Sequence, residues 1–190
     1  KLIILSLFIF TQSQADTIYN LIKIPNLEIY EINTSNKLRY LYATKPFRLG
    51  VNVLKNIQCY NSDKETLNQK YEIISKNLKR YSSSFLSKIN LKYIVLCENL
   101  SIAGINTAGI PNNLTRTLIL DIKFNNNYFE RAIHHEIFHI INDNYKELFD
   151  ENEWKKFNRK NFKYSDCSTC NEKWNLDTFD KTNGFFTEYA

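Results

Sequence analysis

The chain has 190 residues, of which 43% are hydrophobic and 24% charged, so it is long enough to bury one core of ordinary size. Four glycines and three prolines exclude collagen-like and low-complexity chains, and an aromatic content of 14% is too high for a disordered polar tail. The net charge of +5 comes from scattered basic residues rather than a basic stripe. We therefore expect one folded domain and no nucleic-acid partner.

The N-terminal stretch has the three parts of a secretory signal. Lys1 supplies a positive end, Leu2–Phe10 an apolar core, and Ala15 a small residue for cleavage. The apolar run is about half the roughly 18–20 residues of a spanning helix, so we expect no stable membrane span. We predict a signal peptide over residues 1–15 and a secreted or extracytoplasmic domain (periplasm or cell surface) over residues 16–190. A buried strand or short core helix is the alternative for this run.

Export would place the four cysteines in a compartment where thiols oxidise. Four cysteines allow three pairings, and the sequence does not choose between them. The spacing of Cys167 and Cys170 is typical of half a zinc ribbon, but the second C-x-x-C pair is absent, so we favour a local disulfide or free thiols there. The four residues are Cys59, Cys97, Cys167 and Cys170.

The first half of the chain predicts short strands followed by one clear helix. Mixed apolar and polar runs indicate short strands over residues 17–43. Ser62 and Glu65 form a capping box, and apolar residues spaced by three and four continue the helix to Tyr81. Further along, the pattern predicts a buried strand, a loop and a second strand, over residues 93–97, 98–115 and 117–122.

The helical period returns at Tyr128, after a capping site at residues 125–127. A further helix is predicted over residues 146–159. With the strands upstream, the predicted fold class is α+β. The residues that share the apolar face of the helix from Tyr128 are Phe129, Ile133, Ile137, Ile140 and Ile141.

All three histidines lie in the run His134–His139, which contains the pattern H-E-x-x-H. Residues four apart on a helix lie one turn above each other, so the imidazoles of His135 and His139 can hold one Zn²⁺ ion. Glu136 is rotated by about 100° from His135, which suits a general base acting on a metal-bound water. We interpret His134 as a packed or capping histidine. The alternative is a solvated helix with clustered imidazoles.

A catalytic zinc site ordinarily takes three protein ligands and leaves the fourth position to water. Asp143 stands four residues after His139, where we expect it to orient an imidazole N–H rather than bind the metal. Glu188 is the other candidate for the third ligand. The residues themselves leave this choice open.

From about residue 90 to its end, the chain resembles zinc-binding metallopeptidases of the zincin superfamily, of the gluzincin type. The resemblance rests on His134–His139, the loop 103–109, the strand 117–122 and the closing segment 184–190. It implies a zincin-like domain with a mixed sheet and an H-E-x-x-H active-site helix. It also implies that the strand 117–122 forms the cleft wall against which an extended substrate pairs.

The resemblance further implies a glutamate ligand in an acidic stretch that follows the closing segment. The third ligand would then lie beyond Ala190, and the domain would be incomplete at its C-terminus. Two hypotheses follow. The first is an exported zinc metalloendopeptidase that hydrolyses peptide bonds in protein or peptide substrates, with His135 and His139 as ligands and Glu136 as general base. The second is an inactive or truncated, secreted zinc-binding or interaction protein on the same scaffold. Substrate specificity and oligomeric state stay open.

Overall fold

The computed structural model describes residues 26–50, 56–113, 115–150, 152, 153 and 156. The predicted signal peptide, the Cys167–Cys170 pair and Glu188 lie outside the described residues. The chain divides into two compact units, residues 1–144 and residues 145–190. The described elements that bear on the candidate site lie in the first unit.

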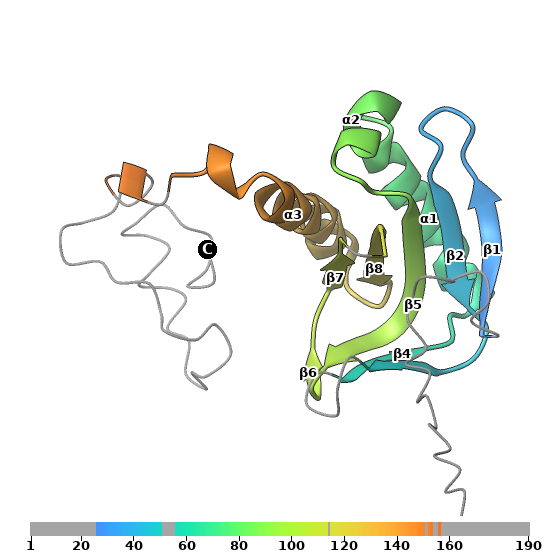
Figure 1. The fold of residues 1–190 in the computed structure, drawn as a ribbon. Helices are drawn as coiled ribbons and strands as arrows, with labels where there is room; N and C mark the ends of the chain where they lie inside the picture. The colour runs from blue at the N-terminus through green and yellow to red at the C-terminus, as the bar shows by residue number, and fades with distance from the viewer. Residues whose placement is uncertain (1–25, 51–55, 114, 151, 154–155, 157–190) are drawn as a thin grey trace, which may run out of the picture. The chain divides into compact units, whose positions relative to one another are not determined.

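A mixed sheet of eight strands forms the first unit in its described part (Figure 1). The first half of β5 lies between β2 and β8 and is parallel to both, whereas its second half pairs antiparallel with β4 and β6. Strands β1 and β7 add antiparallel to β2 and β8. The strands are β1 (Leu27–Ile32), β2 (Arg39–Ala43), β3 (Phe47–Gly50), β4 (Asn56–Tyr60), β5 (Tyr93–Ile102), β6 (Ile105–Asn106), β7 (Gly109–Asn112) and β8 (Thr117–Asp121).

Successive side chains of a strand point to opposite faces of a sheet, and in this sheet buried side chains pack on both faces. On one face Val95 and Cys97 of β5 join a buried apolar cluster that includes Phe47 of β3 and Ile57 of β4. On the other face Tyr40 of β2 packs edge-on against Tyr71 of a helix. The helices are α1 (Lys64–Leu78), α2 (Ser83–Lys88) and α3 (Asn126–Asn144). None of the helices in the described part is long and apolar enough to cross a membrane.

The predicted helix after residue 62 is confirmed as α1, but it ends at Leu78 rather than Tyr81, and its cap is a different residue. Asp63, not Ser62, is the N-cap of α1, and its carboxylate accepts the backbone N–H groups of Glu65 and Thr66. The Ser62 hydroxyl instead donates to the carbonyl of Leu96 at 3.3 Å. A carboxylate that accepts two amide groups caps the helix without the reciprocal capping box.

The predicted loop over residues 98–115 is wrong for most of its length. Strand β5 continues to Ile102, and β6 and β7 follow within the same segment. A turn through Ala103 and Gly104, with φ values of 52° and 81°, reverses the chain between β5 and β6. Polar residues such as Glu98 and Ser101 hid the strand, because both are buried although neither is apolar.

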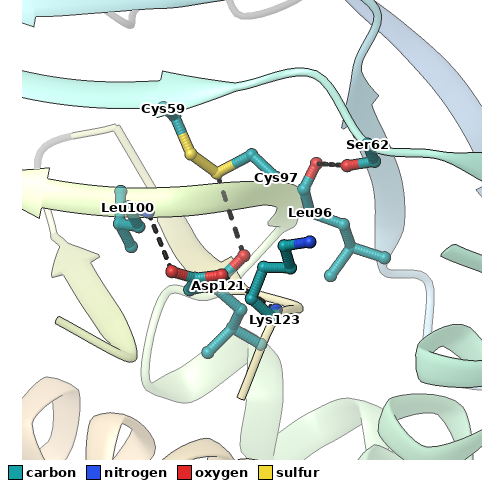
Figure 2. The surroundings of a disulfide bond; sticks show 8 residues. Cys59, Ser62, Leu96, Cys97, Leu100, Asp121 and Lys123 are labelled. Carbon is teal, nitrogen blue, oxygen red and sulfur yellow. Dashed lines mark hydrogen bonds between the residues drawn. A yellow bond between two sulfur atoms is a disulfide. The ribbon is translucent and has the colours of Figure 1, made fainter. Parts of the chain in front are cut away.

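One disulfide joins Cys59 of β4 to Cys97 of β5, which answers the pairing question for these two cysteines. Figure 2 shows it between the two strands, with Asp121 of β8 below them. The Asp121 carboxylate accepts the backbone N–H of Leu100 at 2.9 Å. The disulfide therefore crosslinks strands in the middle of the sheet, where both sulfur-bearing residues are buried.

The second unit does not begin with the predicted helix. Residues Lys146–Leu148 form a single 3-10 turn, and Phe149 after it has extended backbone. Most of the predicted range beyond Asp150 lies outside the described residues.

Candidate metal and catalytic site

Helix α3 carries the H-E-x-x-H residues, and its position is fixed by its ends and its apolar face. The Asn125 side chain accepts the backbone N–H of Tyr128 at 3.0 Å, which confirms a cap at residues 125–127. The apolar face is confirmed for four of its five residues, whereas Ile141 is only half-buried. The buried ones are Phe129, Ile133, Ile137 and Ile140.

The imidazoles of His135 and His139 converge on the open side of α3. Their Nε2 atoms lie 2.9 Å apart, and the ring planes are nearly perpendicular, at 87°. Zinc–nitrogen bonds of about 2.0–2.1 Å at a tetrahedral angle need two nitrogens about 3.3 Å apart. An opening of a few tenths of an ångström would therefore let both nitrogens bind one ion, so this donor pair fits zinc.

Electrostatics favour the neutral form of both rings, which is the form that binds a metal. Partial burial of the ring lowers the pKa of His135, and the neighbouring charge of His139 lowers it further. Burial also lowers the pKa of His139, while the carboxylate of Asp143 acts in the opposite direction. At neutral pH each imidazole thus keeps a lone pair for coordination.

Glu136 faces the sheet rather than solvent, and its residue is only 7% exposed. Its side chain lies against the backbone of Gly109 in β7, where an added Cβ would be 2.4 Å from Cγ and 2.9 Å from Cδ of Glu136. Burial raises the pKa of Glu136 to about 7. A carboxyl group with such a pKa exchanges a proton readily near neutral pH.

The strand beside Glu136 is β7, and this corrects the expected cleft wall. Strand β8, which corresponds to the predicted strand 117–122, pairs with β5 on one side and β7 on the other. A strand paired on both sides has no free edge for a substrate. Among the described strands, β7 is the outer one on this side.

The backbone of Gly109 points to that outer edge. The N–H of Asp121 in β8 donates to the carbonyl of Ala108 at 2.9 Å. In an antiparallel pair, every second residue directs its N–H and C=O away from the partner strand. Gly109 follows Ala108, so its backbone groups face outward, and its carbonyl accepts the Thr107 hydroxyl at 3.1 Å.

His134 is a packed histidine, as its position on the helix predicted. Its Nδ1 lies 2.7 Å from the Tyr81 hydroxyl, and its Nε2 lies 3.1 Å from Oδ1 of Asn77. Asn77 in turn donates through Nδ2 to the carbonyl of Ile73 at 2.9 Å. These bonds connect α3 to the end of α1 and leave His134 out of the metal pair.

No third ligand is present among the described residues, which contain no group of three His, Cys, Asp or Glu residues suited to a metal. Asp143 influences His139 electrostatically, but its Oδ2 lies 3.4 Å from Nδ2 of Asn113, which donates to it. The orienting role of Asp143 toward an imidazole therefore stays a prediction. The candidate Glu188 lies outside the described residues.

The sequence alone did not predict three contacts of the site residues, namely those of Asn77 and Tyr81 with His134 and that of Gly109 with Glu136. Asn77 and Tyr81 reach His134 across more than 50 residues of chain, and only tertiary packing brings them together. Gly109 carries a local signal, since glycine in a strand often marks a close approach of another group. It was not interpreted in this way because residues 98–115 were expected to form a loop, in which glycine is common.

Comparison of the chain with protein-family models, with curated proteins and with solved structures finds no match.

Proposed function

We propose that this protein is a zinc-dependent metallopeptidase with an α+β zincin-like domain. The observation that carries the proposal is that the Nε2 atoms of His135 and His139 converge. The residue that follows His135 in the chain is Glu136, a buried carboxylate. Zinc bound by the two imidazoles would lower the pKa of a coordinated water and polarise a peptide carbonyl. The remaining chemistry falls to residues of the chain.

Glu136 is suited to the proton transfers of amide hydrolysis. Its carboxylate would take a proton from the attacking water and deliver it to the nitrogen of the departing amine. Contact with Gly109 and burial limit the positions that the side chain can adopt. A general base held in one place loses less entropy when the reaction occurs.

The outer edge of β7 is suited to hold an extended peptide. The outward N–H and C=O of Gly109 can pair with the backbone of a substrate strand, in the manner of strand addition. Because Gly109 touches Glu136, a peptide bound there would lie next to the proposed base. Pro111, two residues further along the same edge, offers a carbonyl but no N–H. The proposal thus assigns substrate pairing to β7.

Cleavage of a peptide library by the zinc-loaded full chain tests the proposal. We expect Glu136→Gln to bind zinc as the wild type does and to cleave about 10²–10⁴-fold more slowly, because it loses only the base. Cleavage at equal rates by both proteins would end the catalytic assignment. Chelation of the metal should abolish cleavage, and added zinc should restore it.

A second function is favoured by one specific observation, the lack of a third metal ligand among the described residues. A protein that held zinc through two imidazoles alone would bind it weakly and would cleave nothing. It would then be a zinc-binding or interaction protein. Zinc that exchanges freely with a weak chelator, together with no hydrolysis of any library peptide, would favour this function over the first.

We also propose export of the mature domain. The Cys59–Cys97 disulfide supports it, because disulfides persist mainly in oxidising compartments. N-terminal sequencing of protein recovered from the medium or the cell envelope would test this. Recovery of the protein only from the cytosol, with both thiols free, would contradict it.

A further inference from the structure

One face of the mixed sheet is covered over only part of its length. Along β2 and β5 this face begins with Arg39 and Tyr93, which are half-buried, and then enters the buried apolar cluster at Leu41. The outer strand β1 continues the open part with Ile29, the partner of Leu41, and with Ile32; these two are 46% and 53% exposed. Apolar side chains therefore reach solvent near the starts of β2 and β5.

The face that each of these side chains occupies follows from its neighbours. Tyr40 packs against Tyr71 of α1, so Arg39, the residue before it, points away from α1. Tyr93 is the Cα partner of Arg39 and packs against the buried cluster, on that same side. Ile32 is the Cα partner of Arg39 in β1, and residues paired across strands share a face. All three therefore lie side by side on the face away from α1.

Positive charge gathers at this surface from segments that are far apart in the sequence. The backbone N–H of Arg39 donates to the carbonyl of Lys92 at 3.0 Å. The Lys92 ammonium lies 5.1 Å from the centre of the Tyr93 ring, which places it at the same surface. Lys37 is exposed in the connection between β1 and β2. This connection and the start of β5 lie at the same end of the sheet (Figure 1).

The neighbouring acidic residues lie elsewhere. Glu28 pairs with Tyr42 and accepts its hydroxyl at 2.9 Å, and Glu31 pairs with Tyr40, so both face α1. Helix α2 contains no acidic residue. Asp143 of α3 approaches the end of β7, three strands or about 14 Å from β2. None of the ion pairs between described residues involves the three cations of this surface.

Exposed isoleucines beside cations match a membrane surface that contains anionic lipids. Apolar side chains of a peripheral protein enter the boundary between headgroups and hydrocarbon, while its cations contact the lipid phosphates. A second copy of the chain fits less well, because a symmetric dimer would bring two copies of one positive patch together. A nucleic acid or an anionic polysaccharide fits less well too, because neither offers apolar surface to Ile29 and Ile32.

We propose that this surface docks the protein on a membrane rich in anionic phospholipid, as a peripheral contact. The proposal does not depend on the metal pair, so failure of the peptidase function would leave it standing. The residues that define the surface are Ile29, Ile32, Lys37, Arg39, Lys92 and Tyr93.

Co-sedimentation with vesicles tests the proposal on the protein purified in its exported form. The vesicles consist of phosphatidylcholine alone or of phosphatidylcholine with about 30% phosphatidylglycerol. We expect binding to the anionic vesicles to be about tenfold tighter or more, with a preference that decreases as salt rises. No preference for the anionic vesicles would overturn the proposal.

Charge variants locate the contact. The double variant Arg39→Gln/Lys92→Gln should weaken binding to anionic vesicles about 25-fold, because each cation near such a surface contributes about fivefold. The control Lys64→Gln/Lys76→Gln removes the same charge from exposed positions on α1 and should bind as the wild type does. If the half-buried pair proves necessary for folding, exposed Lys37→Gln gives the same test, with a loss of about fivefold. An equal loss in the control would overturn the assignment to this surface.

The apolar contact separates a lipid surface from other anions. Ile32→Ser should weaken vesicle binding about fivefold, because the isoleucine side chain leaves water on docking. It should leave any binding of heparin or of a single-stranded oligonucleotide unchanged. Binding of heparin or the oligonucleotide without binding of anionic vesicles would overturn the lipid assignment. A dimer that Ile32→Ser dissociates, together with no vesicle binding, would overturn it as well.

Discussion

Replacement of Gly109 by alanine places one methyl group against the proposed general base. The new Cβ would lie 2.4 Å from Cγ and 2.9 Å from Cδ of Glu136, where normal carbon contacts are about 3.5–4.0 Å. Glu136 must therefore move by about 1 Å at its Cγ. Glu136 is 7% exposed and has little room to rotate, so its carboxylate should be displaced from its position beside β7.

The cost to stability follows from two opposing effects. Overpacking of this kind costs about 1–3 kcal/mol, whereas replacing glycine by alanine where the backbone permits it gains about 0.4–1 kcal/mol. We expect a net loss of about 1–2 kcal/mol. At about 2–4 °C per kcal/mol for a chain of this size, the melting temperature should fall by several degrees.

The cost to activity should be larger than the cost to stability. A shift of about 1 Å in a catalytic group can cost about 10²-fold in rate, so we expect kcat to fall by that factor. Zinc affinity should stay unchanged, because the three atoms nearest to the new Cβ all belong to Glu136 and none to His135 or His139. Calorimetry, zinc titration and peptide cleavage on the same preparations measure the three quantities.

The matched control is the same substitution in a chain where the clash is impossible. Glu136→Ala removes Cγ and Cδ, so Gly109→Ala in that background should cost nothing or should stabilise slightly. The two substitutions should therefore couple by about 1–3 kcal/mol, the cost of the overpacking, in a double-mutant cycle. Equal destabilisation in both backgrounds would refute the contact, and full cleavage by Gly109→Ala would refute the need for a fixed Glu136.

Two further predictions concern the framework that holds the site. Replacing Cys59 and Cys97 by serine should lower the free energy of unfolding by up to about 4 kcal/mol, because the disulfide closes a loop with a sequence separation of 38. Urea unfolding measures this loss, and equal urea midpoints for the variant and the wild type would contradict it. Lys70→Met should cost about 1–3 kcal/mol, because the buried ammonium donates to the Phe124 carbonyl and the Asn126 side chain. Burial lowers the pKa of Lys70 below 10.5, so the folded state binds that proton less tightly than the unfolded state does. The stability of the wild type relative to Lys70→Met should therefore rise with pH between the lowered pKa and 10.5. If the difference in unfolding free energy between the wild type and Lys70→Met is constant with pH, the pKa of Lys70 is the same in the folded and unfolded states, and the prediction is wrong.

The elements that the sequence predicts best are those with strong local signals. Helix α3 combines a cap at Asn125 with an apolar face that repeats over several turns, and both signals lie within its own residues. The spacing of His135 and His139 then brings their imidazoles together without help from the rest of the fold. The same helical geometry predicts that Glu136 is rotated by about 100° from His135 on α3.

The features that the sequence missed depend on contacts between distant segments. The second half of β5 is a strand because β4 and β6 pair with it, although Glu98 and Ser101 interrupt its apolar pattern. The resemblance to zincins implied that β8 forms the cleft wall, and nothing in the residues of β8 reveals that β7 covers its outer side. The Cys59–Cys97 pairing likewise required the register of two strands.

The zinc content of the purified chain is the sharpest test of the proposed metal pair, His135 and His139. Equilibrium dialysis against micromolar zinc, followed by metal analysis, should give one zinc ion per wild-type chain and none above background for His135→Ala or His139→Ala. His134→Ala is the control, because this residue contacts Tyr81 and Asn77 instead, and it should keep its zinc. Zinc retained by His135→Ala and His139→Ala at the wild-type level, or no zinc bound by the wild type, would contradict a metal site at these histidines.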